Sequence, residues 1–197
     1  GQQGPLPQFA RMRDVRGDVT FARDSFTATV DGQLEDLPYH VALRYDGTTP
    51  DAPFTLDFVS RDFRVDKSPS LLPYAPPRVR EWLGLFCGPT ALITTQLTVH
   101  RGPPIAGAAA EPRVKGSLTL KEGTAAYFRF PYEFQDMTGT FEFDNDQVKI
   151  VSVKGKSKSG ATIDARGLVA PLDETAEVTV DVKVREAPID SAMEEAF

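Results

Sequence analysis

The alternation of apolar and polar residues is clearest over residues 137–155, where it predicts a β-hairpin. Apolar side chains occupy every second position on either side of Asn145 and Asp146, which is the period of a strand with one buried face. An Asn-Asp pair suits a two-residue turn whose residues adopt positive φ angles. This turn predicts the cross-strand pairs Phe143 with Val148 and Phe141 with Ile150 on the apolar face, and Glu142 with Lys149 on the polar face.

The same two-residue period recurs in two long blocks, residues 15–66 and 91–184. It predicts an all-β fold in which a mainly antiparallel, curled sheet has one apolar and one polar face. Gly32 and Gly47 mark predicted turns in the first block. The apolar positions of the strands are the candidate functional surface, and they comprise Val19, Phe21, Val41, Leu43, Leu56, Phe58, Leu118, Leu120, Phe141, Phe143, Val148 and Ile150.

Between the two blocks, the period changes from that of a strand to that of a helix. In this connecting segment, residues 67–90, a Pro76-Pro77 pair precedes apolar residues spaced i, i+3, i+4 and i+7, and a Gly88-Pro89 pair follows them. The spacing predicts a short amphipathic helix that lies against the sheet through Val79, Trp82, Leu83 and Phe86.

Similar segments recur along the chain at a nearly constant distance, which indicates about one and a half copies of an internal repeat. The matched positions are Gly17 with Gly139 (139 − 17 = 122), the Asp31-Gly32 turn with Lys154-Gly155 (155 − 32 = 123), and Arg61-Asp62 with Arg185-Glu186 (185 − 61 = 124). Loop insertions account for the drift. The repeat predicts that the sheet continues into further repeats of a parent chain, and we expect open edges in such a sheet to favour edge-to-edge self-association.

Composition and charge exclude some classes of function. The chain has 197 residues and a net charge of −6, which argues against a nucleic-acid platform as its main role. Cys87 is the single cysteine, so no internal disulfide forms. Residues 1–14 are predicted to be a linker, and residues 185–197 to begin a further helix. Because no signal-peptide pattern precedes the first block, we expect a piece of a larger exported protein.

No stretch of the sequence carries a recognisable catalytic or metal-binding motif. The segment KGKSKSG at residues 154–160 lacks the glycine that a phosphate loop needs at position 150, and we interpret it as a basic turn. The Asp-Asn-Asp run at residues 144–146 lacks further calcium ligands. His40 and His100 have no Cys or His at ligand spacing. The chain is therefore predicted not to be an enzyme and to need no cofactor or metal.

The order of segments resembles one known family. Glycine-led amphipathic hairpins, a strand ending in DFRVD, the segment PPRVREWL, and the stretches LTVHR and GSLTLKEGTAAYFRFPYEFQDMTGTFEFDNDQVKI are similar to the AsmA-like and TamB-type proteins of bacterial envelopes. The resemblance covers most of residues 15–184, and residues 120–169 carry its most family-like phrase. A Gly/Pro/Ala insertion at residues 102–112 departs from the pattern. The resemblance implies a periplasmic or outer-membrane-associated lipid-transfer protein, linked to outer membrane biogenesis, whose sheet forms an apolar trough for acyl chains.

Two interpretations of the apolar positions remain open from the sequence. In the first, part of the apolar face lines a groove that binds or conducts lipid, since an acyl chain gains about 0.8 kcal/mol for each buried CH₂ group. In the second, the same residues form the closed core of a β-sandwich, used as a structural or adhesion module of a large secreted or surface protein. The two differ in whether the apolar face is covered.

Overall fold

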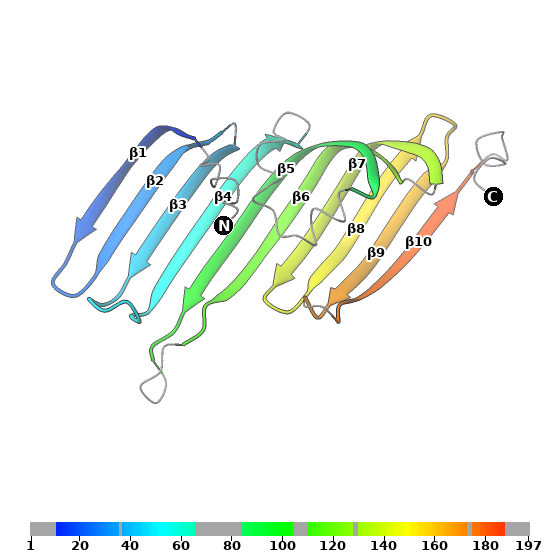
Figure 1. Cartoon of the computed structure of the whole chain (residues 1–197). Helices are drawn as coiled ribbons and strands as arrows, with labels where there is room; N and C mark the ends of the chain where they lie inside the picture. Colours follow the sequence, from blue (N-terminus) through cyan, green and yellow to red (C-terminus); the bar gives the residue numbers. More distant parts are fainter. Residues whose placement is uncertain are drawn as a thin grey trace, which may run out of the picture.

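The computed structural model describes residues 11–35, 37–65, 84–104, 110–127, 130–172 and 175–187, which form one ten-stranded antiparallel sheet (Figure 1). The strands are β1 (Met12–Phe21), β2 (Phe26–Leu34), β3 (Leu37–Tyr45), β4 (Phe54–Arg64), β5 (Phe86–Arg101), β6 (Arg113–Tyr127), β7 (Phe130–Asp144), β8 (Val148–Ser157), β9 (Thr162–Ala170) and β10 (Glu177–Arg185). The predicted all-β, antiparallel class is confirmed.

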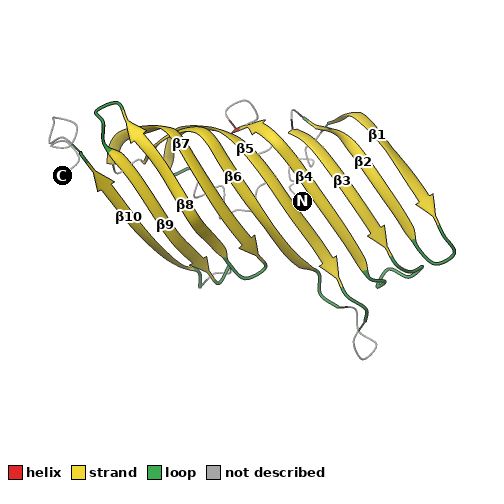
Figure 2. Cartoon of the chain, turned by 180° about the vertical axis from the view of Figure 1, so that it is seen from behind, coloured by secondary structure: helices red, strands yellow, loops and turns green. Residues whose placement is uncertain are grey.

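Each strand pairs with the strands that come before and after it in the sequence, so the spatial order is β1 to β10. Figures 1 and 2 show this order from the two sides of the sheet, with β1 at one edge and β10 at the other. Pairing between β4 and β5 joins the two predicted blocks into one continuous sheet. The sheet is open, and among the described residues no second sheet packs on it, as a β-sandwich requires.

The predicted hairpin is formed by β7 and β8. Its turn closes where expected, because the backbone N–H of Asp144 donates to the carbonyl oxygen of Gln147 at 3.0 Å. The expectation of positive φ angles is wrong for both Asn145 and Asp146. Instead, the Asp144 carboxylate accepts hydrogen bonds from the backbone N–H groups of Asp146 at 2.9 Å and Gln147 at 3.0 Å. The predicted pairs Phe143–Val148, Phe141–Ile150 and Glu142–Lys149 are all present.

The prediction of one or two short helices does not hold in the described residues, which contain no α-helix. Phe86, expected in the last turn of the first helix, instead begins β5 and pairs with Tyr127. Long-range pairing with β6 thus outweighs the local helical spacing. Val79, Trp82 and Leu83 lie outside the described residues. The expected second helix, residues 185–197, also lies mostly outside the described residues, which end at residue 187. Its first residue, Arg185, is the last residue of β10.

Gly32 and Gly155 were expected in turns, but both lie inside strands. Each glycine makes room for a large neighbour on the adjacent strand. A Cβ atom at Gly32 would lie 2.7 Å from the hydroxyl of Tyr39, and one at Gly155 would lie 2.8 Å from the side chain of Met137. The absence of a side chain therefore serves packing across the sheet at these two positions.

Acidic residues in the left-handed conformation mark β-bulges in four strands. Asp14, Asp62, Glu122 and Asp136 have φ angles between 49° and 51°, and the pairing register shifts beside each of them. A bulge inserts an extra residue, bends the strand and increases its twist. The long strands β5, β6 and β7 are visibly bent at one end, so the sheet curls over there (Figures 1 and 2).

Two four-strand units of the sheet have matching registers. β1–β4, here called the first unit, correspond to β7–β10, the second unit, with β5 and β6 between them. The row of partners Phe21, Phe26, Tyr45 and Phe54 corresponds to Phe143, Val148, Val169 and Val178, at offsets of 122, 122, 124 and 124 residues. The offset between the two units grows from 122 to 124 residues for two reasons. Val151 in β8 has no partner in the pairing with β7 and adds one residue, and the longer β8–β9 turn adds the second.

Candidate functional site: the apolar face of the sheet

The register brings all of the predicted groove residues to one face of the sheet. Cross-strand partners lie on the same face, so a row of partners can be followed from strand to strand. The row that passes through the middle of the sheet contains Val30, Val41, Phe58, Leu97, Gly116, Phe143, Val148, Val169 and Val178. The flanking rows contain Val19, Leu43 and Leu56 on one side, and Leu118, Phe141 and Ile150 on the other.

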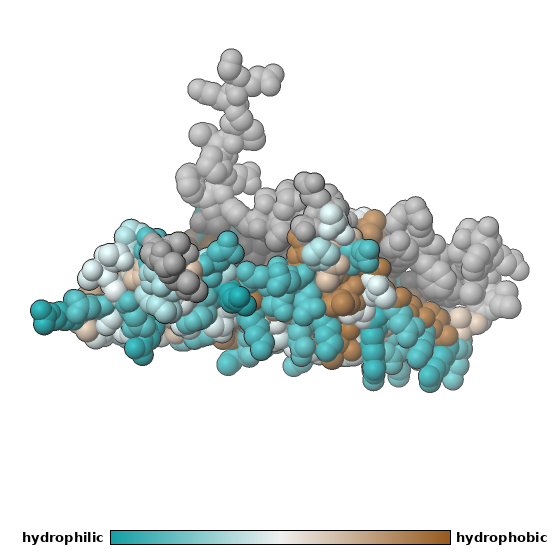
Figure 3. Space-filling view, turned by 90° about the horizontal axis from the view of Figure 1, so that it is seen from below, coloured by the Kyte–Doolittle hydropathy of each residue, from teal (hydrophilic) through white to brown (hydrophobic). Residues whose placement is uncertain are grey.

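This apolar face is continuous across all ten strands. Figure 3 shows teal, hydrophilic side chains along one side of the C-terminal half of the sheet and brown, hydrophobic ones on the other. At about 4.8 Å per strand, ten strands make a face about 43 Å across. Polar side chains interrupt it at few places, among them Ser60, Thr95 and Arg101. The structure therefore assembles one broad apolar surface from strands distant in sequence.

The apolar residues are covered only in part. Of the predicted groove residues, Ile150 is buried, with 6% of its surface exposed, whereas Val19 and Phe21 are 54% and 78% exposed. The other nine are half-buried. Phe134 and Ile150 are the only large apolar side chains that are buried among those whose burial the structure describes. This distribution differs from that of a closed core, in which most large apolar side chains lose contact with solvent.

A row of aromatic rings lies at the end of the apolar face near the β1–β2 turn. Ring centroids are 6.0 Å apart for Phe21 and Phe26, 5.3 Å for Phe26 and Tyr45, and 6.4 Å for Tyr45 and Phe54. The guanidinium of Arg101 lies over Phe54, 4.8 Å from the ring centroid, and ends the row. No pattern in the sequence predicted this row, although Phe21 and Phe26 flank one turn and Tyr45 and Phe54 flank another.

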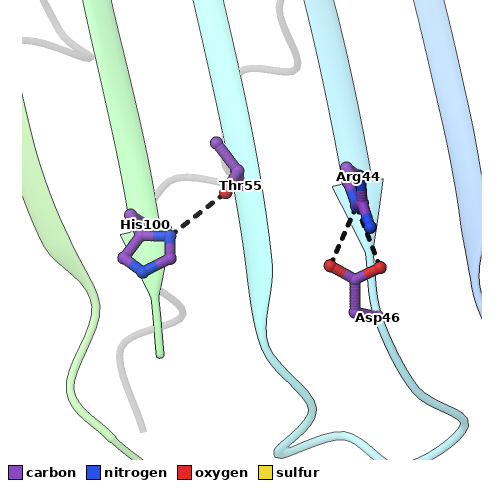
Figure 4. A network of polar contacts seen from close by, with 4 residues as sticks. All are labelled: Arg44, Asp46, Thr55 and His100. Carbon is purple, nitrogen blue, oxygen red and sulfur yellow. Dashed lines mark hydrogen bonds and ion pairs between the residues drawn. The ribbon is translucent and has the colours of Figure 1, made fainter. Parts of the chain in front are cut away.

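The opposite face is largely polar and holds both histidines. His40 Nδ1 lies 2.8 Å from a carboxylate oxygen of Asp31. Figure 4 shows His100 on β5 pointing towards Thr55 on β4, with 3.1 Å between His100 Nδ1 and Thr55 Oγ1. In the same view, the Nε–H of Arg44 donates to both carboxylate oxygens of Asp46 at 3.0 Å. These contacts are cross-strand or local pairs of an exposed sheet surface.

A shallow hollow of about 470 Å³ lies on the polar face of the second unit. Four basic side chains line it, from Lys154, Lys156, Lys183 and Arg185, together with two carboxylates. Two of these lysines belong to the segment that was interpreted as a basic turn, and the structure places them on β8 instead. Most of its lining residues are polar and belong to polar rows, such as the cross-strand partners Lys154, Asp164 and Lys183, and Ile163 is the one large apolar residue among them.

The carboxyl group of Asp144, at the β7–β8 turn, has a shifted pKa. The pKa of Asp144 is held below its usual value, first by the hydrogen bond from the backbone N–H of Asp146 and then by the one from the side chain of Gln147. The positive charge of Lys115 acts in the same direction. The side chain of Asn145 ties the turn to the start of β6, because its amide nitrogen donates to the carbonyl oxygen of Pro112 at 3.0 Å and its amide oxygen accepts from the backbone N–H of Val114. The lowered pKa therefore reflects turn formation.

The described residues contain neither a metal site nor a membrane-spanning helix. No group of three or more His, Cys, Asp and Glu side chains is arranged to hold a metal ion within this part of the chain. Nor does this part include a helix with the length and hydrophobicity needed to cross a membrane. The apolar face is thus the most extensive feature that the sheet offers for function.

Comparison with known proteins finds no family model, curated protein or solved structure that matches the chain.

Proposed function

We propose that the apolar face binds lipid acyl chains and that the chain is a segment of an AsmA-like lipid-transfer protein of the bacterial envelope, with no catalytic activity of its own. The observation that carries the proposal is the continuity of a partly exposed apolar face across ten strands. The resemblance of residues 120–169 to the family supports the assignment to the envelope and to outer membrane biogenesis.

The chemistry of the face favours acyl chains over other ligands. Its rows consist mainly of Val, Leu, Ile and Phe, which offer no directional hydrogen bonds. A ligand held there gains free energy from apolar area, at about 0.8 kcal/mol for each CH₂ group removed from water. Because this gain does not depend on the position of a chain along the rows, a lipid could slide from strand to strand. A protein that conducts lipid along its sheet requires such movement of the acyl chains.

The first experiment is native mass spectrometry of the freshly purified protein, followed by solvent extraction of whatever it carries. We expect adducts in the mass range of phospholipids. The Leu118→Asp, Phe141→Asp double variant changes a cross-strand pair in the middle of the apolar face, and we expect it to lose the adducts. Uptake of a fluorescent fatty acid provides an independent measurement on the same proteins.

The residues adjacent to Leu118 and Phe141 on the same two strands provide a matched control. Thr119 and Thr140 are also cross-strand partners, but they lie on the polar face. The Thr119→Asp, Thr140→Asp variant therefore places the same two charges on the same two strands and should keep the adducts. Circular dichroism tests whether both variants fold. A wild-type protein that carries no lipid and takes up no fatty acid would contradict the proposal and favour a structural role for the sheet.

A further inference from the structure

The two edges of the sheet carry most of the exposed apolar side chains of the described residues. Ten large hydrophobic side chains are exposed, and eight of them lie on β1 or β10. They are Met12, Val15, Val19 and Phe21 on β1, and Val178, Val180, Val182 and Val184 on β10. Every residue of both strands is exposed, and the outer edge of each strand has no partner within the described part of the sheet.

The geometry allows the two edges to pair with each other between two copies of the chain. The sheet has an even number of antiparallel strands, so β1 and β10 run in opposite directions (Figure 1). A second copy in the same orientation therefore presents its β1 antiparallel to β10 of the first copy. In that arrangement the apolar faces of both copies lie on the same side, and the rows continue without interruption.

The charges on the polar face favour one register over the two nearest alternatives for this pairing. When Val178 pairs with Val19 of the second copy, Asp181 lies opposite Arg16, and this register extends over residues 177–181 of β10, up to the bulge beside Asp14 in β1. A shift of two residues in one direction places Glu177 opposite Asp18, and a shift in the other places Asp181 opposite Asp18. Both shifts bring like charges together, which disfavours them.

The selected register also extends existing patterns within each copy. Asp181 already pairs with Arg166 on β9, and Arg16 already pairs with Asp31 on β2, so the new contact continues an alternation of charges across four strands. On the apolar face, Val180 would lie between Gly167 on β9 and Gly17 of the second copy. The small residues on both sides leave room for the Val180 side chain.

We propose that β10 of one copy pairs with β1 of a second copy in this register, so that the chain assembles head to tail and extends its apolar face. The interface is heterologous, because different edges meet, and growth does not stop at a dimer unless the rotation between copies closes a ring. The proposal concerns copies of the 197-residue chain and does not rest on lipid binding; in a longer parent protein, flanking repeats would occupy the same two edges.

Sedimentation velocity of the 197-residue chain over a wide concentration range tests the assembly. We expect species larger than the monomer to grow with concentration. Arg16→Asp and Asp181→Arg each place like charges opposite one another at the interface, so each should weaken association roughly tenfold or more. The double variant restores opposite charges in reversed order and should associate again. Mixing the two single variants should also restore association, since each supplies the edge that complements the other.

Lys121→Asp is the matched control, because it reverses an exposed charge on an interior strand and should leave association unchanged. Circular dichroism of each variant reports whether the sheet remains folded, and the mixing experiment tests pairing even if a single variant loosens its own edge. A wild-type chain that stays monomeric at high concentration would overturn the proposal. Association that survives Arg16→Asp unchanged would also overturn it and would indicate contact through the apolar faces instead.

Discussion

The first unit, β1–β4, and the second unit, β7–β10, share a backbone plan but differ in what surrounds them. Gly17 and Gly139 occupy the same place in each unit, as do the left-handed residues Asp14 and Asp136. However, β7 has β6 beside it, whereas β1 is an edge strand. Two strands with the same pattern therefore have different burial. The comparison shows that a neighbouring strand, more than a strand's own alternation, determines how much of its apolar surface is covered.

The units also differ in the side chains that fill equivalent rows. The aromatic row of the first unit, from Phe21 to Phe54, corresponds in the second unit to one Phe followed by three Val residues. Rings stack along the first row, while β-branched side chains cover the second with less volume. The same backbone arrangement thus carries two different apolar surfaces. Substitutions at equivalent positions test which of these differences affect stability.

The largest expected effect contrasts Phe134 with its equivalent, Met12. Phe134 is 6% exposed and Met12 is 65% exposed. Phe134→Ala should lower the free energy of unfolding by about 3 kcal/mol, since it removes a buried ring and leaves a cavity. Met12→Ala should change it by less than about 0.5 kcal/mol. Urea denaturation followed by circular dichroism measures both, and equal losses would show that the neighbouring strand is not the cause.

The second contrast is between Gly17 and Gly139. A Cβ atom at Gly17 would overlap the backbone carbonyl oxygen of Thr29, which cannot move without disturbing the pairing of β1 with β2. At Gly139 the nearest atoms belong to the side chains of Phe141 at 3.1 Å and Val153 at 3.3 Å, which can adjust. Gly17→Ala should therefore cost about 1–3 kcal/mol, and Gly139→Ala less.

Amide hydrogen exchange measures this difference strand by strand. Gly17→Ala should speed exchange in β1 and β2 while leaving β7 and β8 protected. Faster exchange of β7 and β8 in Gly139→Ala, with β1 unchanged in Gly17→Ala, would reverse the expected order and contradict the packing argument.

The third contrast concerns the aromatic row. Tyr45→Val gives the first unit the residue that Val169 supplies in the second unit and removes the stacking of Tyr45 on Phe26 and Phe54. We expect a loss of about 1–2 kcal/mol in the free energy of unfolding. Tyr45→Phe keeps the ring and removes only the hydrogen bond to the carbonyl oxygen of Thr49, so its loss should be smaller. If both variants lose the same stability, stacking does not contribute.

The smallest contrast lies in the hairpin turns. Both turns close with a backbone hydrogen bond, from Ala22 to Ser25 and from Asp144 to Gln147, but only the second turn begins with a carboxylate. Because the pKa of Asp144 is lowered by folding, the ionised carboxylate stabilises the turn at pH values above the usual pKa of 3.8. That contribution is lost as the pH falls through the lowered pKa.

An NMR titration should therefore show an Asp144 pKa below 3.8. Exchange of the turn amides should become faster at acidic pH in the β7–β8 turn relative to the β1–β2 turn. Asp144→Ala serves as the control, because it should remove the pH dependence from the second turn. An Asp144 pKa at or above the usual value would contradict this account.

Some features could be predicted from the sequence because they depend on near neighbours in the chain. The β7–β8 pairs follow from the position of one turn and a period of two, and every predicted groove residue lies on the predicted face for the same reason. Phe86 shows the limit of this reasoning. Its helical spacing is a local signal, yet it pairs with Tyr127, forty-one residues away (127 − 86 = 41), and no local pattern contains that partner.

The sequence by itself determined that this protein is a β-sheet with one apolar face, since side-chain alternation assigns each residue to a face before any strand has a partner. Only the tertiary structure decided that the sheet is open, that β1 and β10 are its edges, and that aromatic rings from two separate hairpins form one row. Those properties depend on contacts between residues distant in the chain, and the free energy of such contacts is absent from any short window of sequence.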